Sequence, residues 1–396
     1  MLSDRILNIE VSATARVSAV AIQMKREKID VVDFSIGEPD FPTPQNIKNA
    51  AIQAIRNNHS RYTLIPGIIE LRQAIAQKLK RENNLDYQVD QIIVSNGAKH
   101  SIYNIILTLV NRDDEVILPA PYWVSYPEMV RFAEGRPVII PTSEETDFKL
   151  TAAQLDAAIT GKTKALIMCS PSNPTGSLYS KKELAALAEV ISGRDIFIIS
   201  DEIYEKLVYD GQQAVSMATL SPAMKKQTIV INGLSKAYAM TGWRIGYAAG
   251  EKEIIDGAGK LQSHSTTNAS SISQYAGIEA LNGVQNQIVK MRDEYEKRRN
   301  FVFESLREME GIICRKPQGA FYAFPNVSRF FNQVNQDPPI NNSTAMALYL
   351  LKEAKVVLMP GEAFGADDYL RISYATSMQQ IREGMSRIKK VLAGLL

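Results

Sequence analysis

The sequence predicts an α/β protein, with a mostly parallel sheet in a large unit and a smaller α+β unit toward the C-terminus. Short apolar runs rich in β-branched residues alternate with helical patterns through much of the chain. These runs lack polar alternation, which indicates strands covered on both faces, as in parallel sheets. The length of 396 residues, with 45% hydrophobic residues, allows two or three domains with large cores.

The elements follow one another in a regular order. An amphipathic pattern predicts a helix over 14–29, and the proline-rich segment GEPDFPTP at 37–44 predicts an irregular turn. A long charged amphipathic helix is expected at 292–310, leading into the smaller unit. Between them we expect strands at 92–95, 115–118, 138–140, 165–169, 196–200, 228–231 and 245–248, and helices at 98–111, 123–133 and 180–192.

We therefore divide the chain into three parts. Residues 1–44 form an N-terminal segment expected to pack with the small domain. Residues 45–290 form the large domain, and residues 291–396 form the small C-terminal domain.

Composition excludes several function classes. The net charge of +2, with no basic stripe, predicts neither a nucleic-acid nor a membrane partner. No apolar run reaches the roughly 18 residues of a membrane span, and the N-terminus lacks the apolar core of a signal peptide. Two cysteines, Cys169 and Cys314, fit a reducing cytoplasm, and three scattered histidines predict no metal site.

The segment GLSKAYAMTGWRIGY at 233–247 is the most informative motif. Lys236 follows a predicted buried strand in a turn of small residues, and Arg244 lies eight positions later. A lysine that condenses with an aldehyde needs a partly dehydrated, deprotonated amine, and an arginine can hold a dianionic phosphate by two contacts. Together they indicate pyridoxal phosphate bound as a Schiff base, the alternative being an ordinary surface lysine.

Other candidate residues also follow predicted strands, where ligands gather in open parallel sheets. Gly97 permits close backbone approach, and the amides of Ala98 and Lys99 can cradle a phosphate at a helix N-terminus. Trp123 can stack on an aromatic ring. The alternatives are an ordinary strand–helix turn for the first group and a core side chain for Trp123.

Four polar side chains complete the set. The amide of Asn173, in SPSNPTG, can donate to a phenolate oxygen or a carboxylate, although this motif also suits a plain turn. Asp201 can keep a pyridine nitrogen protonated or cap a helix, and Tyr204 can reach the phenolate oxygen. Arg371, inside a short apolar strand, can grip a substrate α-carboxylate or form a structural salt bridge.

These motifs resemble those of the class I, fold-type I aminotransferases that depend on pyridoxal phosphate, and most of all the bacterial aspartate aminotransferase subgroup. The resemblance runs from VSAT at 11–14 to RISYATS at 371–377. It implies a mostly parallel seven-stranded sheet in a large cofactor-binding domain beside a smaller α+β domain. It also implies transfer of the amino group of L-aspartate to 2-oxoglutarate, giving oxaloacetate and L-glutamate.

The resemblance implies a role for each residue around the cofactor. Lys236 carries the cofactor and moves the proton, and Asp201 pairs with the pyridine nitrogen. Tyr204 and Asn173 contact the ring hydroxyl, and Trp123 stacks on the ring. The phosphate is surrounded by Gly97, Ala98, Lys99, Ser235 and Arg244.

Substrate and partner contacts are implied in the same way. Arg371, Asn173 and the backbone of Gly37 hold the substrate α-carboxylate, near Trp123. The acidic side chain of the substrate meets Lys99 and residues near Ser12 and Thr14. Tyr62, in RYTLIPG, matches a tyrosine that reaches the phosphate of the neighbouring subunit, which implies a homodimer with shared active sites.

Departures and rival functions remain open at this point. Glu10 lies where many relatives carry part of a Lys-Pro pair linked to prephenate, which weakens the case for prephenate. Ser172 replaces the usual asparagine of SPNNPTG, with little effect expected. The rivals are an aminotransferase for aromatic or other amino acids, a C–S lyase acting by β-elimination, and a cofactor-binding regulator. The last needs a preceding DNA-binding module, for which the 36 residues before Gly37 leave no room.

Overall fold

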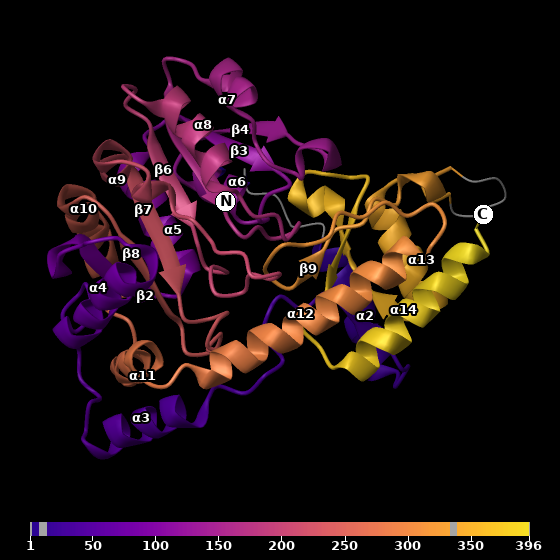
Figure 1. Ribbon diagram of the computed structural model, residues 1–396, viewed down its shortest axis with the longest axis horizontal. Helices are drawn as coiled ribbons and strands as arrows, with labels where there is room; N and C mark the ends of the chain where they lie inside the picture. Colours follow the sequence, from indigo (N-terminus) through magenta and orange to yellow (C-terminus); the bar gives the residue numbers. More distant parts are fainter. Residues whose placement is uncertain (1, 8–13, 333–338, 396) are drawn as a thin grey trace.

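The computed structural model describes residues 2–7, 14–332 and 339–395. Its centre is a seven-stranded sheet in the order β2-β8-β7-β6-β5-β3-β4, which Figure 1 shows beside a second, C-terminal unit. The strands are β2 (Ile92–Asn96), β3 (Glu115–Ala120), β4 (Arg136–Pro141), β5 (Thr163–Cys169), β6 (Phe197–Asp201), β7 (Thr228–Gly233) and β8 (Ile245–Ala249).

The sheet is mostly parallel, as predicted. The exception is β8, which runs antiparallel to both of its neighbours, β2 and β7. Because of this reversal, the residue that precedes β8, Arg244, lies at the edge of the sheet where β2 and β7 end. An apolar run carries no signal of its direction, so the sequence did not predict the reversal.

Helices cover both faces of the sheet, because successive side chains of a strand point to opposite sides. Ile229 and Ile231 of β7 share a core with α5 (Ala98–Leu109), α6 (Tyr126–Phe132) and α10 (Lys252–Ser263). Val230, between them, belongs to the opposite core with α4 (Ile69–Asn83) and α11 (Ser271–Asn282). The same face, farther along the sheet, is covered by α7 (Ala152–Ala158), α8 (Lys181–Ile191) and α9 (Pro222–Gln227).

The C-terminal unit has its own apolar core. A small sheet in the order β11-β12-β9 joins β11 (Met359–Pro360), β12 (Leu370–Ser373) and β9 (Tyr322–Ala323). The helices here are α2 (Thr14–Arg26), α12 (Asn286–Arg307), α13 (Ser343–Ala354) and α14 (Met378–Ala393). The N-terminal segment also holds α1 (Asp4–Leu7), and α3 (Gln45–Arg56) packs on α11.

Two features bear on the division of the chain. The long helix α12 runs from one unit to the other in Figure 1: its Met291 packs in the core with α4 and α11, whereas Val302 packs in the C-terminal core. The N-terminal strand β1 (Val32–Asp33) pairs in parallel with β10 (Val356–Val357) of the C-terminal unit. These contacts support the proposed boundaries near 44 and 290, which stay a prediction.

Element ends differ from the predicted ones in places. The helix expected at 123–133 begins only at Tyr126, because the preceding residues form a turn in which the Tyr126 amide donates to the carbonyl of Trp123 at 3.0 Å. This turn leaves Trp123 before the helix and free to face the site. Within the described ranges, every helix is too short or too polar to cross a bilayer.

Candidate active site

The carboxyl edge of the large sheet opens into a cavity of about 500 Å³, within the usual size range of small-molecule sites. Segments that follow β2, β3, β5, β6 and β7 contribute its walls, and β12 of the C-terminal unit closes another side. The predicted residues that line it are Gly37, Ala98, Lys99, Trp123, Asn173, Asp201, Tyr204, Ser235, Lys236, Arg244 and Arg371.

Lys236 follows β7 and keeps only part of its surface accessible, in the cavity wall. Its Nζ donates to the carbonyl oxygen of Gly37 at 2.5 Å. Burial and, to a smaller extent, the nearby positive charge of Arg371 lower the pKa of this amine to about 8. A sizeable fraction of Lys236 is therefore uncharged just above neutral pH, as a nucleophilic or basic amine requires.

Asp201 ends β6 and is buried on the neighbouring strand. The hydroxyl of Tyr126 donates to its Oδ2 at 2.6 Å, and the amide of Ile203 donates to its Oδ1 at 3.2 Å. Burial raises the pKa of Asp201 to about 6, whereas the Tyr126 hydrogen bond acts in the opposite direction. No helix begins at Asp201, so the capping interpretation is wrong, and the carboxylate is held in place by two donors.

The raised pKa makes a stability prediction for the protein without cofactor. The pKa of Asp201 is 3.8 in an ordinary setting and near 6 in the folded protein, so the folded protein holds this proton more tightly than the unfolded chain. The resulting contribution to the free energy of unfolding is complete below pH 3.8 and is lost as pH rises through 6. We expect Asp201→Asn to stabilise the apoprotein by about 3 kcal/mol at pH 8 and by almost nothing at pH 4. Urea unfolding of both proteins at the two pH values measures this difference, and a difference that does not change with pH would contradict the assignment.

Arg371, on β12, is buried and faces the cavity. Its Nη1 donates to Oδ1 of Asn173 at 3.0 Å and its Nη2 donates to the carbonyl of Ser35 at 2.7 Å, while its Nε has no hydrogen-bond partner. The guanidinium also lies 4.6 Å from the ring centroid of Tyr322. In the part of the chain that the structure describes, no carboxylate pairs with Arg371, so the salt-bridge interpretation gains no support.

The N-terminus of α5 forms the opposite end of the cavity. Gly97 has φ +84°, and a Cβ there would lie 2.1 Å from Nη2 of Arg244, so this close approach needs a glycine. Arg244 itself has φ +56° and donates to the carbonyls of Thr241 at 2.9 Å and Asn96 at 3.1 Å. Since the first amides of a helix have no partner within the helix, the amides of Ala98 and Lys99 are available to an anion.

Aromatic side chains line the space between these ends. Nζ of Lys99 lies 4.7 Å from the ring centroid of Trp123, and burial lowers the pKa of Lys99. The hydroxyls of Tyr204 and Tyr322 lie 2.9 Å apart, so Tyr204 has a hydrogen-bond partner inside the cavity. Both tyrosines have their pKa raised by burial, which keeps the hydroxyls protonated.

Some predicted residues lie elsewhere. Gly97 lies beneath Arg244 and does not line the cavity. Tyr62 is 87% exposed and lies outside the cavity of its own chain. The backbone of Thr14 begins α2, but its side chain, like Glu10 and Ser12, lies outside the described residues.

Sequence reasoning missed several residues of the cavity wall. Tyr126 could have been predicted from the sequence, because it lies three residues after Trp123 in the same motif. Glu38, whose Oε2 accepts from Thr241 at 2.8 Å, and Tyr322 gave no comparable signal. Among the described residues, four basic side chains and two carboxylates line the cavity: Lys99, Lys236, Arg244, Arg371, Glu38 and Asp201. This charge balance favours an anionic ligand.

Comparisons with known proteins identify the family of this chain. Residues 29–388 match the family model described as aminotransferase class I and II. An aspartate aminotransferase of Bacillus subtilis is 46% identical and an aspartate/prephenate aminotransferase of Nitrosomonas europaea is 44% identical, covering 98% and 99% of this chain and 98% and 100% of their own lengths. The crystal structure of the aspartate aminotransferase from Rhizobium meliloti superposes with a TM-score of 0.96 at 41% identity, covering 99% of both chains. The chain therefore belongs to the class I and II aminotransferases.

Proposed function

We propose that this protein is an aspartate aminotransferase that uses pyridoxal 5′-phosphate to transfer the amino group of L-aspartate to 2-oxoglutarate. The observation that carries the proposal is the arrangement of Lys236 and Arg371, a low-pKa amine and an anion-binding guanidinium with an unused Nε, in one cationic cavity. The names of the relatives support aspartate as the amino donor.

The residues present fit the cofactor. A dianionic phosphate suits the amides at the start of α5 together with Ser235 and Arg244, and a flat ring suits the space beside Trp123. Asp201, buried and held by Tyr126, suits a protonated pyridine nitrogen, and Tyr204 suits the ring hydroxyl. When bound, pyridoxal phosphate supplies an aldehyde for the amino group and a ring that takes up the electron pair left at Cα.

The chain's own groups position the substrate and move its proton. Arg371 binds the α-carboxylate through two N–H groups, and Asn173, already in contact with it, fixes the orientation of the guanidinium. The amine of Lys236 takes the proton from Cα as a general base with a pKa near the working pH, and it would pass that proton to the cofactor carbon that carried the aldehyde. The negative charge of Asp201 holds a proton on the pyridine nitrogen throughout.

We propose Lys99 as the partner of the substrate's side-chain carboxylate. It lines the cavity as a partly buried cation whose amine lies over Trp123. A buried cation with no substrate carboxylate to pair with is costly, so it favours aspartate and glutamate over apolar donors.

A second candidate is the transamination of prephenate, which is favoured by relatives named aspartate/prephenate aminotransferases. The chain carries Glu10 where many of these relatives carry part of a Lys-Pro pair, and this residue lies outside the described ranges. We therefore rank prephenate behind aspartate.

We further propose a homodimer in the cytoplasm, with Tyr62 reaching the phosphate of the second copy's cofactor. Large apolar side chains are exposed within a few residues of Tyr62 in the sequence, including Leu64 at 54% and Ile55 at 58%. Exposed apolar side chains that form a patch are typical of a surface that a partner covers. Residues 45–290 would then hold the cofactor, and residues 1–44 and 291–396 would close over it.

A panel of amino donors with 2-oxoglutarate as acceptor tests the proposed function. We expect kcat/KM for L-aspartate to exceed that for L-alanine by about a hundredfold, since a charged hydrogen bond contributes about 1.5–3 kcal/mol. Replacing Lys99 with methionine should lower kcat/KM for aspartate and leave kcat/KM for alanine unchanged, so that most of the preference for aspartate is lost.

The same panel separates the rivals. If Lys99→Met lowers kcat/KM for both donors equally, Lys99 serves the phosphate end of the cofactor and not the substrate side chain. If the wild-type protein releases pyruvate and ammonia from cystathionine without a keto-acid acceptor, and is slow with aspartate, the chain is a C–S lyase.

A further inference from the structure

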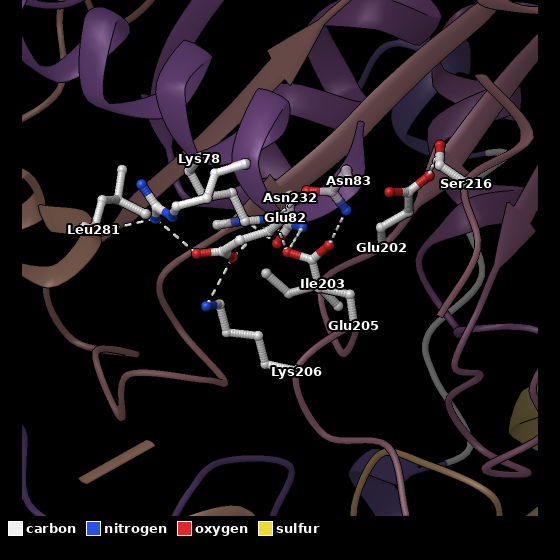
Figure 2. A network of polar contacts seen from close by, with 12 residues as sticks. Lys78, Glu82, Asn83, Glu202, Ile203, Glu205, Lys206, Ser216, Asn232 and Leu281 are labelled. Carbon is white, nitrogen blue, oxygen red and sulfur yellow. Dashed lines mark hydrogen bonds and ion pairs between the residues drawn. The ribbon is translucent and has the colours of Figure 1, made fainter. Parts of the chain in front are cut away.

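A buried lysine outside the cavity lies behind the active site. Lys78, on α4, is 1% exposed, and lysine is almost never buried unless its charge is paired. Its Nζ donates to Oδ1 of Asn83 at 2.8 Å and forms an ion pair with Glu205, as Figure 2 shows. Neither Lys78 nor Glu205 lines the catalytic cavity.

Glu205 joins three segments of the chain. Besides the ammonium of Lys78, its Oε1 accepts from Nδ2 of Asn232 at 2.8 Å, and its Oε2 accepts from Nδ2 of Asn83 at 2.6 Å. Asn232 in turn accepts from the amide of Gly233 at 2.7 Å. The carboxylate of Glu205 thus ties α4 to the segment after β6 and to the end of β7.

The two segments tied by Glu205 carry the central groups of the active site. Glu205 directly follows Tyr204 and lies four residues after Asp201, in a stretch without regular helix or strand. Asn232 lies four residues before Lys236. A shift of Glu205 would therefore move the residues proposed to contact the pyridine nitrogen and the ring hydroxyl, and would loosen the turn that presents the amine.

The charges around Lys78 are balanced. Glu205 pairs with Lys78 directly, and Glu82 lies 3.9 Å from its ammonium. Glu82 also pairs with Lys206 at 2.8 Å and with Arg81 at 2.7 Å. A third carboxylate, Glu202, is buried nearby and accepts from the hydroxyls of Ser200 and Ser216. Loss of Lys78 alone would leave the largely buried carboxylate of Glu205, whose side chain is 10% exposed, without its counter-charge.

We propose that Lys78 is a positioning residue for the reaction: its buried ion pair with Glu205 fixes the 201–205 segment and the end of β7 relative to each other. The inference rests on the proposed function. It concerns groups that touch neither substrate nor cofactor and act only through the residues that do.

The test compares three variants of the holoenzyme with wild type. Lys78→Met removes the ammonium at similar length, and Lys78→Met/Glu205→Gln removes both charges and keeps one acceptor oxygen in place of the two that Asn232 and Asn83 use. Lys206→Met is the matched control, because it removes a cation from the same cluster that pairs with Glu82 and not with Glu205. The readouts are Tm, kcat and KM for aspartate, and the midpoint of the pH titration of the bound cofactor's absorbance.

A positioning role predicts that stability and catalysis separate. Lys78→Met should have a lower Tm, and its kcat should fall by about ten- to a hundredfold with KM little changed, since small misplacements are costly. The double variant should regain Tm, because no buried charge is left unpaired, yet keep the low kcat and a displaced absorbance midpoint. Lys206→Met should match wild type in kcat and midpoint.

Both kcat and the absorbance midpoint are measured well below the Tm of each variant, with folding verified by circular dichroism. A variant of lower stability therefore still tests the positioning role of Lys78. A folded double variant with the kcat and midpoint of wild type would overturn the proposal and leave Lys78 a purely structural residue. If Lys206→Met displaced the absorbance midpoint as much as Lys78→Met, the effect would come from the loss of any nearby positive charge, and the proposal would be overturned. Failure of the proposed function would be visible earlier, as a wild-type protein without cofactor absorbance or aspartate turnover.

Discussion

Replacing Lys236 with alanine is expected to lower kcat for aspartate transamination by at least about four orders of magnitude, because one amine both holds the cofactor and moves the Cα proton. Burial places the pKa of this amine at about 8, so wild type has the free base available near neutral pH. Single-turnover mixing of the cofactor-loaded variant with L-aspartate, followed by absorbance, measures the loss directly.

The control for this variant is chemical. A small added amine, such as methylamine, should restore part of the half-reaction in proportion to its concentration, since the cavity vacated by the side chain admits it. If the half-reaction ran at an appreciable rate with no amine added, another group would have to be the base, and the assignment of Lys236 would fail.

Replacing Arg371 with leucine should lower kcat/KM for aspartate by about three orders of magnitude, because a site built to bind a carboxylate loses its main donor. Cofactor affinity should hold, since Arg371 comes from β12 of the C-terminal unit, whereas most of the proposed cofactor contacts come from the large sheet. Steady-state kinetics and a cofactor titration on the same preparation give both numbers.

Arg371→Lys is the matched variant. It keeps the positive charge but lacks the planar pair of donors, so it should recover only part of the lost kcat/KM. A leucine variant that retained kcat/KM within about tenfold of wild type, while losing stability, would mean that Arg371 is a structural arginine held by Asn173 and the Ser35 carbonyl.

The fold class, and most residues that line the candidate site, could be predicted because both follow from local patterns. Apolar runs such as Ile229–Ile231 mark buried strands, and a polar residue directly after such a run, as at Asp201, lies at the edge where ligands bind. Arg371 stood out for a similar reason, as a charge inside a short apolar strand. The structure brings Asp201 and Arg371 to one cavity.

What could not be predicted depends on contacts between distant segments. Tyr126 and Asp201 are 75 residues apart, and Lys78 and Glu205 are 127 residues apart. Helical spacing places Lys78 on the same face of α4 as Leu71 and Ile75, unlike the exposed Lys80, but its partner Glu205 is fixed only by the packing of α4 against the rest of the large unit. The direction of β8 was hidden for the same reason, since strand pairing is a property of the whole sheet.

The claim on which the account rests is that Lys236 is the residue bonded to the cofactor. Borohydride reduction of the pyridoxal phosphate-loaded protein, followed by digestion and mass spectrometry, tests it directly. We predict a stoichiometric phosphopyridoxyl group on the peptide that contains Lys236 and on no other. A label on a different lysine, or a protein that takes up no cofactor, would contradict the account.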